Sequence, residues 1–361
     1  MKLGDFEAKV EALLSALCAR VPFLKLKSLQ REVMVSGIKA DWLAELDARG
    51  HSWTWVVECK RYGEPREVRT GLLQLQNTLN VLKGKTCYGV LVAPFLSDES
   101  ARLCAGEGVG YADLAGNARL SFDGVFIETH AAGNPFRARR RLRSLFGAKA
   151  GRILRVLLTP PLRSWKVKAL AAAAGVSLGQ VSNVRKMLLD QEWAVADADG
   201  LRLSQPEKLA RAWQSAYEPR LHSRETVYTL LHDEALEDAT RAALAEAGQG
   251  ARLVLASYSA ARWLAPYARQ ATQFFYADEE GASIAKRHLQ LQPVDSGENV
   301  VLLEPREDDV FSGRLEAAPG VWCTGLLQTW LDLSAAGERG GEAAERLLQE
   351  KLLPAWKETA S

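Results

Sequence analysis

Residues 41–60 hold two runs of β-forming residues on either side of a turn, and this feature limits the fold of the chain more than any other. The turn, Asp47-Ala-Arg-Gly50, has residues that can close a tight hairpin. Because side chains alternate along a strand, Glu58 and Lys60 of the second run project from the same face. The hairpin returns Asp41 to the same strand end. The sequence therefore predicts two acids and one lysine at one edge of a sheet.

These three side chains can support a defined chemistry. Two carboxylates can hold a hard divalent cation through oxygen ligands, and a lysine can orient or deprotonate a water and stabilise negative charge on a phosphate. Four apolar residues lie close to Glu58 in the sequence, which is unusual for a strand that faces solvent. They are Trp53, Trp55, Val56 and Val57. The set is suited to phosphodiester hydrolysis, and the other interpretation is an exposed strand face with alternating charges.

The same stretch resembles the PD-(D/E)xK, or restriction-endonuclease-like, nuclease superfamily. The resemblance is carried by Asp41 and by the triplet Glu58-Cys59-Lys60. These residues precede a predicted helix at residues 65–83 and an apolar strand at residues 88–93, which is the order of the superfamily core. One departure is Ala40, where the pattern has a proline that shapes the strand and contributes no metal ligand.

The resemblance implies a restriction-endonuclease-like α/β/α core over residues 1–132 and a role for each matched residue. Asp41 and Glu58 would ligate Mg²⁺ or Mn²⁺, with help from the Cys59 carbonyl. Lys60 would serve the attacking water. The implied catalytic set is therefore Asp41, Glu58 and Lys60, and the implied metal ligands are Asp41, Glu58 and Cys59.

Three further polar residues are interpreted as structural. Gln76 lies beside the apolar stripe of the predicted helix at residues 65–83 and, although it could reach the site, is interpreted as a surface residue. Asp113 and Asn117 lie at a turn between two β-rich runs. Both residue types are common in turns, which is a sufficient local explanation.

Charge is distributed unevenly along the chain. The net charge is only +2, yet residues 129–189 contain no acid. Such a segment is expected to bind a polyanion. Its basic residues are Arg137, Arg139, Arg140, Arg141, Arg143, Lys149, Arg152, Arg155, Arg163, Lys166, Lys168, Arg185 and Lys186. The five arginines between positions 137 and 143 belong to a predicted linker, residues 133–148, and we expect them to contact DNA phosphates rather than form a solvated tail.

Three predicted helices and a hairpin follow this linker. The helices are expected at residues 149–158, 166–174 and 177–192, and the hairpin at residues 193–203. This order is typical of a winged helix-turn-helix, which we place at residues 149–206. The alternative is a winged helix that binds protein.

The third helix of this set carries the predicted DNA-reading surface. Val181, Val184 and Leu188 recur at helical spacing and predict its buried face. The outward residues and a flanking arginine are then predicted to contact DNA. They are Ser182, Asn183, Arg185 and Lys186. Asp197 and Asp199 at the hairpin tip would repel phosphate, so we expect the helix rather than the wing to read the DNA.

Residues 207–361 turn acidic and alanine-rich and predict a third, α/β domain. Strands are expected at residues 226–231, 252–256, 273–277 and 300–303, and helices at residues 234–247 and 260–268. The stretch at residues 321–345 resembles the C-terminal region of AbiEi-type antitoxins, the repressor components of type IV toxin-antitoxin systems. This resemblance covers residues 150–355 and implies a cognate toxin as a partner.

Length and composition exclude other classes. With 361 residues, 47% of them hydrophobic, the chain can bury two or three ordinary cores. No apolar run has the length of a membrane span and the N-terminus lacks a signal-peptide layout, so we expect a cytoplasmic protein. The five cysteines are dispersed without C-x-x-C spacing, so neither disulfides nor a zinc site is expected.

Together these features predict an α/β multidomain protein that binds double-stranded DNA. Two functions remain open. In the first, a magnesium-dependent PD-(D/E)xK endonuclease domain is targeted by the winged helix. In the second, the chain is an AbiEi-like transcriptional repressor or antitoxin whose nuclease-like domain does not cleave. A homodimer is the default expectation, because winged-helix regulators are commonly two-fold symmetric.

Overall fold

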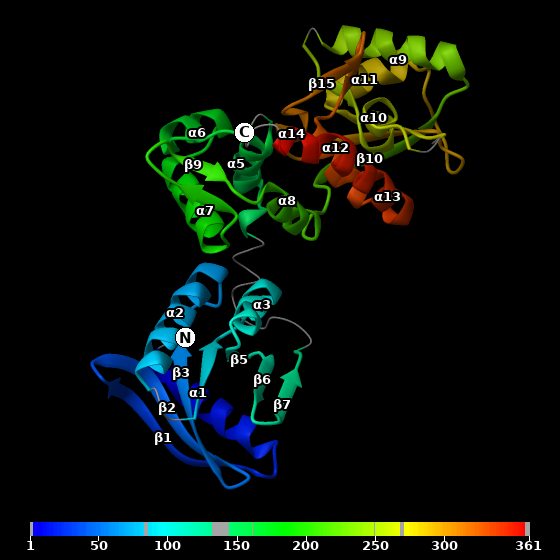
Figure 1. Cartoon of the computed structure of the whole chain (residues 1–361). Coiled ribbons are helices and arrows are strands. Elements are labelled where there is room, and N and C mark those ends of the chain that lie inside the picture. The colour runs from blue at the N-terminus through cyan, green and yellow to red at the C-terminus, as the bar shows by residue number, and fades with distance from the viewer. Residues whose placement is uncertain are drawn as a thin grey trace. The chain divides into compact units, whose positions relative to one another are not determined.

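In the part of the chain that the computed structural model describes, the strands form two seven-stranded sheets and one two-stranded hairpin (Figure 1). The described residues are 3–82, 86–131, 144–160, 162–248, 250–267 and 271–357. They divide into two compact units, Met1–Ser144 with Lys186–Glu192, and Leu145–Arg185 with Trp193–Ser361. Helices and strands are mixed throughout, which confirms the predicted α/β multidomain class. Among the described residues, no helix combines the length and apolar character needed to span a membrane.

The sheet of the first unit has the order β1-β2-β3-β4-β5-β6-β7, so strands adjacent in sequence are adjacent in space. The pairs β3–β4 and β4–β5 are parallel and the other four are antiparallel. The strands are β1 (Leu24–Val35), β2 (Ile38–Ala48), β3 (His51–Cys59), β4 (Cys87–Ala93), β5 (Gly110–Asp113), β6 (Ala118–Phe122) and β7 (Val125–Thr129). The helices are α1 (Leu3–Ala19), α2 (Pro65–Val81) and α3 (Asp98–Gly106). Helices α2 and α3 provide the crossovers that parallel strands require.

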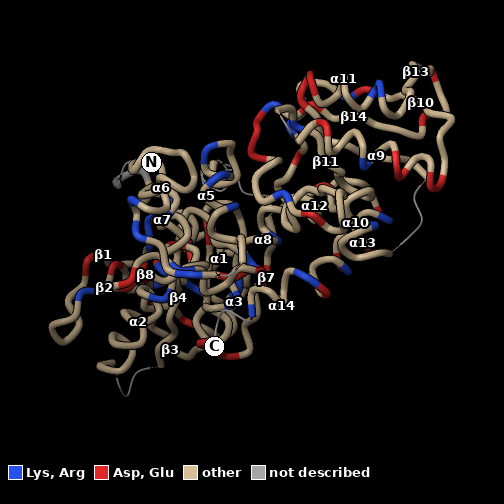
Figure 2. Tube along the Cα trace, turned by 90° about the horizontal axis from the view of Figure 1, so that it is seen from above, with Lys and Arg blue, Asp and Glu red and all other residues tan. Residues whose placement is uncertain are grey.

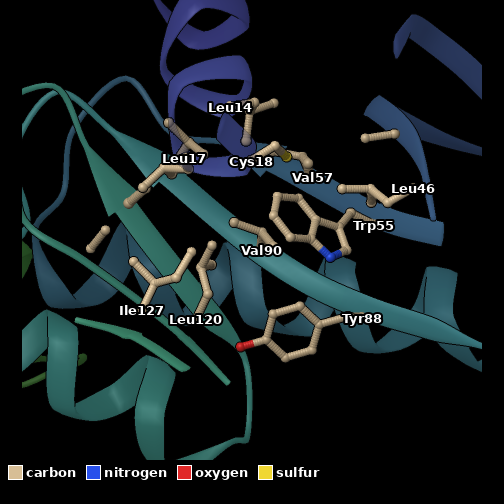
Figure 3. Close-up of a cluster of buried hydrophobic side chains, with 14 of the residues drawn as sticks. Leu14, Leu17, Cys18, Leu46, Trp55, Val57, Tyr88, Val90, Leu120 and Ile127 are labelled. Atoms are coloured by element: carbon tan, nitrogen blue, oxygen red, sulfur yellow. The ribbon is translucent and has the colours of Figure 1, made fainter. Parts of the chain in front are cut away.

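Two hydrophobic cores lie on opposite faces of this sheet. Trp55 and Val57 of β3 pack with Leu14 and other residues of α1 on one face (Figure 3). Val56 packs with residues of α2 and α3 on the other face. The sheet is therefore covered by helices on both faces, and the alternation predicted for β3 is confirmed. Glu58, two residues after Val56, belongs to the face covered by α2.

The turn between β2 and β3 has the geometry that its sequence predicts. Ala48 pairs with His51, so Arg49 and Gly50 form a two-residue loop. Both residues have positive φ angles, 54° and 85°, as a type I′ hairpin turn requires. The Gly50 N–H also donates to Asp47 Oδ1 at 3.0 Å. This turn fixes the antiparallel register that places Asp41 near Glu58.

Three short helices and a hairpin follow residue 144, as predicted, and all of them belong to the second unit except Lys186–Glu192, which includes the end of the third helix. The elements are α5 (Ala148–Leu158), α6 (Val167–Ala174), α7 (Leu178–Asp190), β8 (Ala194–Ala196) and β9 (Leu201–Leu203). Gly175 ends α6 with a φ angle of 61°, a conformation that favours glycine. Trp165, which precedes α6, forms an antiparallel bridge to Leu201 and adds a third extended segment beside the hairpin. Helix α8 (Pro206–Gln214) follows.

The sheet of the second unit has the order β13-β10-β14-β12-β11-β16-β15 and mixes parallel and antiparallel pairs. Its strands are β10 (Leu221–Tyr228), β11 (Leu253–Leu255), β12 (Gln273–Ala277), β13 (Gln292–Pro293), β14 (Val300–Pro305), β15 (Leu315–Ala318) and β16 (Val321–Cys323). The helices are α9 (Asp233–Ala247), α10 (Ser257–Leu264), α11 (Glu279–His288), η1 (Asp308–Phe311), α12 (Leu326–Ser334), α13 (Gly337–Leu347), η2 (Leu348–Leu352) and α14 (Leu353–Lys357). Each of the four predicted strands overlaps a strand of this sheet.

Candidate functional site

Asp41 and Glu58 lie at neighbouring positions of β2 and β3. Trp42 pairs with Val57 in the antiparallel register, and Asp41 and Glu58 are the next residues along the two strands. The N–H of Cys59 donates to Asp41 Oδ2 at 2.7 Å. This hydrogen bond holds the Asp41 carboxylate against the end of β3, so the hairpin brings the two predicted acids together.

Glu58 is buried and pairs with Lys60. Only 7% of Glu58 is exposed, and its Oε1 lies 2.8 Å from Lys60 Nζ. Burial raises the pKa of Glu58, the Asp41 charge adds to this shift, and the hydrogen bond from Lys60 opposes it. A bound cation would relieve the repulsion between the two carboxylates. The geometry thus places all three predicted catalytic side chains at one strand end.

Helix α2 supports the lysine from the other side. Gln74 Oε1 accepts a second hydrogen bond from Lys60 Nζ. Gly71, one turn earlier on α2, leaves space for the lysine, since a Cβ atom there would lie 2.7 Å from Lys60 Cε. The Lys60 backbone N–H donates to Val92 O of β4 at 2.8 Å. The position of Lys60 is therefore fixed by contacts from both its own sheet and α2.

Gln74 is not among the site residues predicted from the sequence, in which Gln76 is the glutamine that could reach the site. Gln76 Nε2 donates instead to Glu107 Oε2 at 2.7 Å. The pair Gly71 and Gln74 is spaced i, i+3, which places both on one face of α2. A small residue followed by an amide at this spacing is the only sequence signal for the contact.

The donor set at this strand end fits a hard divalent cation. The carboxylates of Asp41 and Glu58 supply two oxygen donors here, and the backbone carbonyl of Cys59 is the further oxygen ligand that the family resemblance implies. Mg²⁺ commonly binds through one or two carboxylates and keeps several waters. Among the described residues, no group of three or more His, Cys, Asp or Glu side chains could hold a metal ion. Any cation held here would therefore depend on waters or substrate oxygens for its remaining ligands.

Asp113 and Asn117 have structural roles that agree with their interpretation as turn residues. The buried Asp113 carboxylate accepts the N–H groups of Leu96, Ala115 and Asn117 and the Asn117 side-chain amide, at 2.8–3.0 Å. Asn117 Oδ1 accepts the N–H of Ala131 at 2.7 Å. These bonds close the loop between β5 and β6 and leave no role for Asp113 at the strand end of β3.

Helix α7 presents the predicted DNA-facing residues to solvent. Ser182, Asn183 and Lys186 are exposed, and Arg185 is half-buried. The predicted stripe on the opposite face is buried: Val181, Val184 and Leu188. Figure 2 shows where lysines and arginines fall along the chain. The linker arginines Arg137, Arg139, Arg140, Arg141 and Arg143 lie outside the described residues.

Asp197 at the hairpin tip has a local structural explanation. Its Oδ1 accepts the N–H groups of Asp199 and Gly200 at 2.8 and 3.1 Å. The N–H and C=O groups of Gly200 also bond to Asp197. The acid therefore stabilises the hairpin turn, which is a sufficient structural reason for its presence.

Comparison with known proteins identifies a family likeness in the second unit. Residues 202–353 match the model of a family described as a transcriptional regulator, AbiEi antitoxin, of type IV toxin-antitoxin systems. The predicted resemblance to AbiEi-type antitoxins is thus confirmed for this part of the chain. The match begins after β8 and covers less than half of the 361 residues. No curated protein matches the chain.

The chain is also similar to solved endonuclease structures. A repair endonuclease from Pyrococcus abyssi has 24% sequence identity and a TM-score of 0.22, over 29% of this chain and 46% of that one. The EndoMS–dsDNA2 complex has 28% identity and a TM-score of 0.21, over 29% and 44% of the two chains. EndoMS in its apo form has 22% identity and a TM-score of 0.22, over 30% and 45%. This chain therefore spans less than half the length of these structures.

Proposed function

We propose that the chain is an AbiEi-like transcriptional regulator or antitoxin that binds double-stranded DNA. The family match over residues 202–353 carries this proposal. The three helices α5, α6 and α7 and the hairpin β8–β9 precede this region in the order of a winged helix-turn-helix. A cognate toxin is the partner that the family description implies, and a homodimer and a cytoplasmic location belong to the same proposal.

In this function, α7 enters the major groove. Ser182 and Asn183 can form hydrogen bonds with base edges, and Lys186 can contact a base or a phosphate. All three are exposed, and the helix surface around them has no acid before Asp190. The buried residues on the opposite face hold the helix in place. Helix α7 thus has a buried apolar face and an exposed polar face, which supports its proposed role in DNA recognition.

The test is DNA affinity as a function of salt concentration for the parent and Lys186→Ala. Loss of one phosphate contact reduces the slope of log K against log salt by about one. Lys351→Ala is the matched control, because Lys351 is exposed but lies in η2. Equal affinity of parent and Lys186→Ala across the salt series would contradict the assignment of α7.

A second function is favoured by the strand-end geometry, and it is metal-dependent cleavage of DNA. Asp41 and Glu58 would hold Mg²⁺ or Mn²⁺ together with the Cys59 carbonyl. The cation would supply charge that stabilises a phosphate under attack. Lys60 would hold and orient the attacking water, while Gln74 and Glu58 keep its amine in position. The observation that supports this function is that three side chains meet at one strand end. Glu58 is buried, the Asp41 carboxylate is held by the Cys59 N–H, and the Lys60 amine makes two side-chain hydrogen bonds.

The test compares supercoiled plasmid and linear duplex DNA incubated with Mg²⁺, Mn²⁺ or EDTA, using the parent and Glu58→Ala. Metal-dependent nicking that Glu58→Ala lacks would support the nuclease function and make the winged helix its targeting device. DNA that is retarded but intact in every lane would leave the regulator function alone. Asp123→Asn is the control variant. It changes an exposed acid that lies away from the Glu58 end of β3, so it should keep the activity of the parent.

A further inference from the structure

The second unit contains a cluster of buried and half-buried polar side chains, which we call the Asp332 cluster. Its members come from α5, the chain after α8, β12, η1 and α12. The cluster therefore joins the helices of the proposed DNA-binding region to the C-terminal α/β region; α5, α8 and α12 are labelled in Figure 1. The members are Arg155, Tyr217, Tyr276, Asp309, Gln328 and Asp332. Buried polar clusters of this size are uncommon because each unsatisfied group costs stability.

Asp332 accepts three hydrogen bonds through a single oxygen atom. Tyr217 Oη and Tyr276 Oη donate to Asp332 Oδ1 at 2.7 and 3.0 Å. Gln328 Nε2 donates to the same oxygen at 2.7 Å and to Tyr217 Oη at 2.8 Å. These donors come from three different segments, so the position of Asp332 depends on all of them.

Gln328 connects Asp332 to α5. Its Oε1 accepts from Arg155 Nη2 at 2.6 Å, which fixes the orientation of the amide. Arg155 Nε in turn donates to Asp309 Oδ2 at 2.9 Å. Helix α5 is attached to the same region at its end, where Trp356 Nε1 of α14 donates to Leu158 O at 2.8 Å. Arg155 is therefore the charged link between the cluster and the first helix of the proposed DNA-binding region.

The charges of the Asp332 cluster do not balance when both acids are ionised. Two carboxylates, Asp309 and Asp332, face one guanidinium, Arg155. Only 6% of Asp332 is exposed, and its Oδ2 has no hydrogen-bond partner. The other titratable groups that face Asp332, Tyr217 and Tyr276, have pKa values raised well above their ordinary range by burial, so they stay neutral donors. A single proton on Asp332 would neutralise the excess charge.

We propose that Asp332 makes the folding of α5 together with the C-terminal α/β region sensitive to pH, with one proton on Asp332 stabilising this folded unit against unfolding. Burial raises the pKa of Asp332 to about 6, against the opposing effect of its three donors and of Arg155. Because the folded state binds the proton more tightly than the unfolded chain does, the stabilisation is complete below the unfolded pKa. It is lost as the pH rises through the folded pKa.

The experiment measures hydrogen exchange at the backbone amides of α5 in the full-length protein without DNA, so its outcome does not depend on the proposed function. For a carboxyl group with a folded pKa of about 6, linkage gives about a fourfold tighter closed state at pH 5.5 than at pH 7.5. The protection of α5, corrected for intrinsic exchange rates, should rise by this factor in the parent. In Asp332→Asn the protection should be equal at the two pH values.

Two further variants make the result decisive. Tyr276→Phe removes one donor to Asp332, which should move the midpoint of the pH dependence to higher pH. Glu345→Gln breaks an exposed ion pair between α13 and Arg211 of α8 and should keep the fourfold effect of the parent. An unchanged pH effect in Asp332→Asn, an unmoved midpoint in Tyr276→Phe, or loss of the effect in Glu345→Gln would each overturn the proposal.

Discussion

The Glu58 carboxyl group lies where burial and a neighbouring charge act in the same direction. Both disfavour its ionised form, and only Lys60 opposes them. A bound divalent cation requires the ionised form. The same features that make the site costly without a cation therefore increase the electrostatic benefit of binding one.

This environment makes cation binding depend on pH. The pKa of Glu58 is raised, so protons compete with Mn²⁺ at higher pH than they would at an ordinary glutamate. In titration calorimetry at a series of decreasing pH values, the Mn²⁺ affinity should fall while the pH is still above the ordinary pKa of glutamate. Glu45→Gln, an exposed acid of β2, should leave this profile unchanged. A flat affinity down to that range would contradict the prediction.

Gly71 provides a second prediction at this scale. The Cβ of Gly71→Ala would lie 2.7 Å from Lys60 Cε and 2.8 Å from Leu91 Cδ1, so the lysine must move. We expect any cleavage activity to fall at least about tenfold, equivalent to roughly 1.4 kcal/mol, while overpacking costs about 1–3 kcal/mol of folding stability.

The matched control for this change is Gly106→Ala. Gly106 is also helical, at the end of α3, but an added Cβ there has no neighbour within 4 Å. It should leave activity unchanged and alter stability by less than about 1 kcal/mol. Full activity in Gly71→Ala, measured on plasmid DNA, would show that the position of Lys60 is not critical.

The sequence predicted the convergence of Asp41, Glu58 and Lys60 because alternation along a strand and a two-residue turn are local properties. The contribution of Gln74 was not predictable in the same way. Which residue of α2 reaches Lys60 depends on how the helix crosses the sheet, and that is set by packing of side chains distant in sequence. Strand patterns thus predicted the acids, whereas the supporting helix residue required the structure.

Among the elements, the loop between β5 and β6 depends on one carboxylate. Asp113→Asn would replace Oδ2 with an amide nitrogen, which faces the donors Leu96 N–H and Asn117 Nδ2. Two buried donors would lose their acceptor, so we expect a loss of roughly 2–4 kcal/mol in the free energy of unfolding. Urea denaturation of the full chain measures this loss.

Asp123→Asn is the control for that substitution. Asp123 accepts a single bond from Trp53 Nε1 at 3.0 Å in an exposed turn, and its φ angle of 46° is one that asparagine tolerates. We expect a change below about 1 kcal/mol. Similar losses for the two variants would indicate that the four bonds to Asp113 contribute little.

Element length explains which parts of the second unit were predictable. Helix α7 has 13 residues, and the recurrence of Val181, Val184 and Leu188 is enough to assign its buried face. Strands β13, β15 and β16 have two to four residues, too few to show alternation. The residue pattern predicts neither these strands nor helix α11. Residues 328–333 form part of α12.

At the scale of the whole molecule, the proposed functions place recognition and chemistry in different groups of residues. Lys186 lies on α7, and Glu58 lies on β3. If both proposals hold, Lys186→Ala should weaken DNA binding by about 1 kcal/mol, or roughly fivefold. It should leave Mn²⁺ affinity unchanged. Glu58→Ala should retain DNA affinity and lose Mn²⁺ binding and cleavage.

The double variant distinguishes independent roles from a shared one. Substitutions that share no partner usually have additive effects, so Glu58→Ala with Lys186→Ala should bind DNA as Lys186→Ala does and should not cleave it. Fluorescence anisotropy with EDTA measures the affinity, and calorimetry measures Mn²⁺ binding. If Glu58→Ala alone weakened DNA binding in EDTA as much as Lys186→Ala, the strand end would act as a DNA-binding surface rather than a cation site. The nuclease-like domain would then serve the regulator as a second DNA contact, because affinity measured in EDTA contains no contribution from metal coordination.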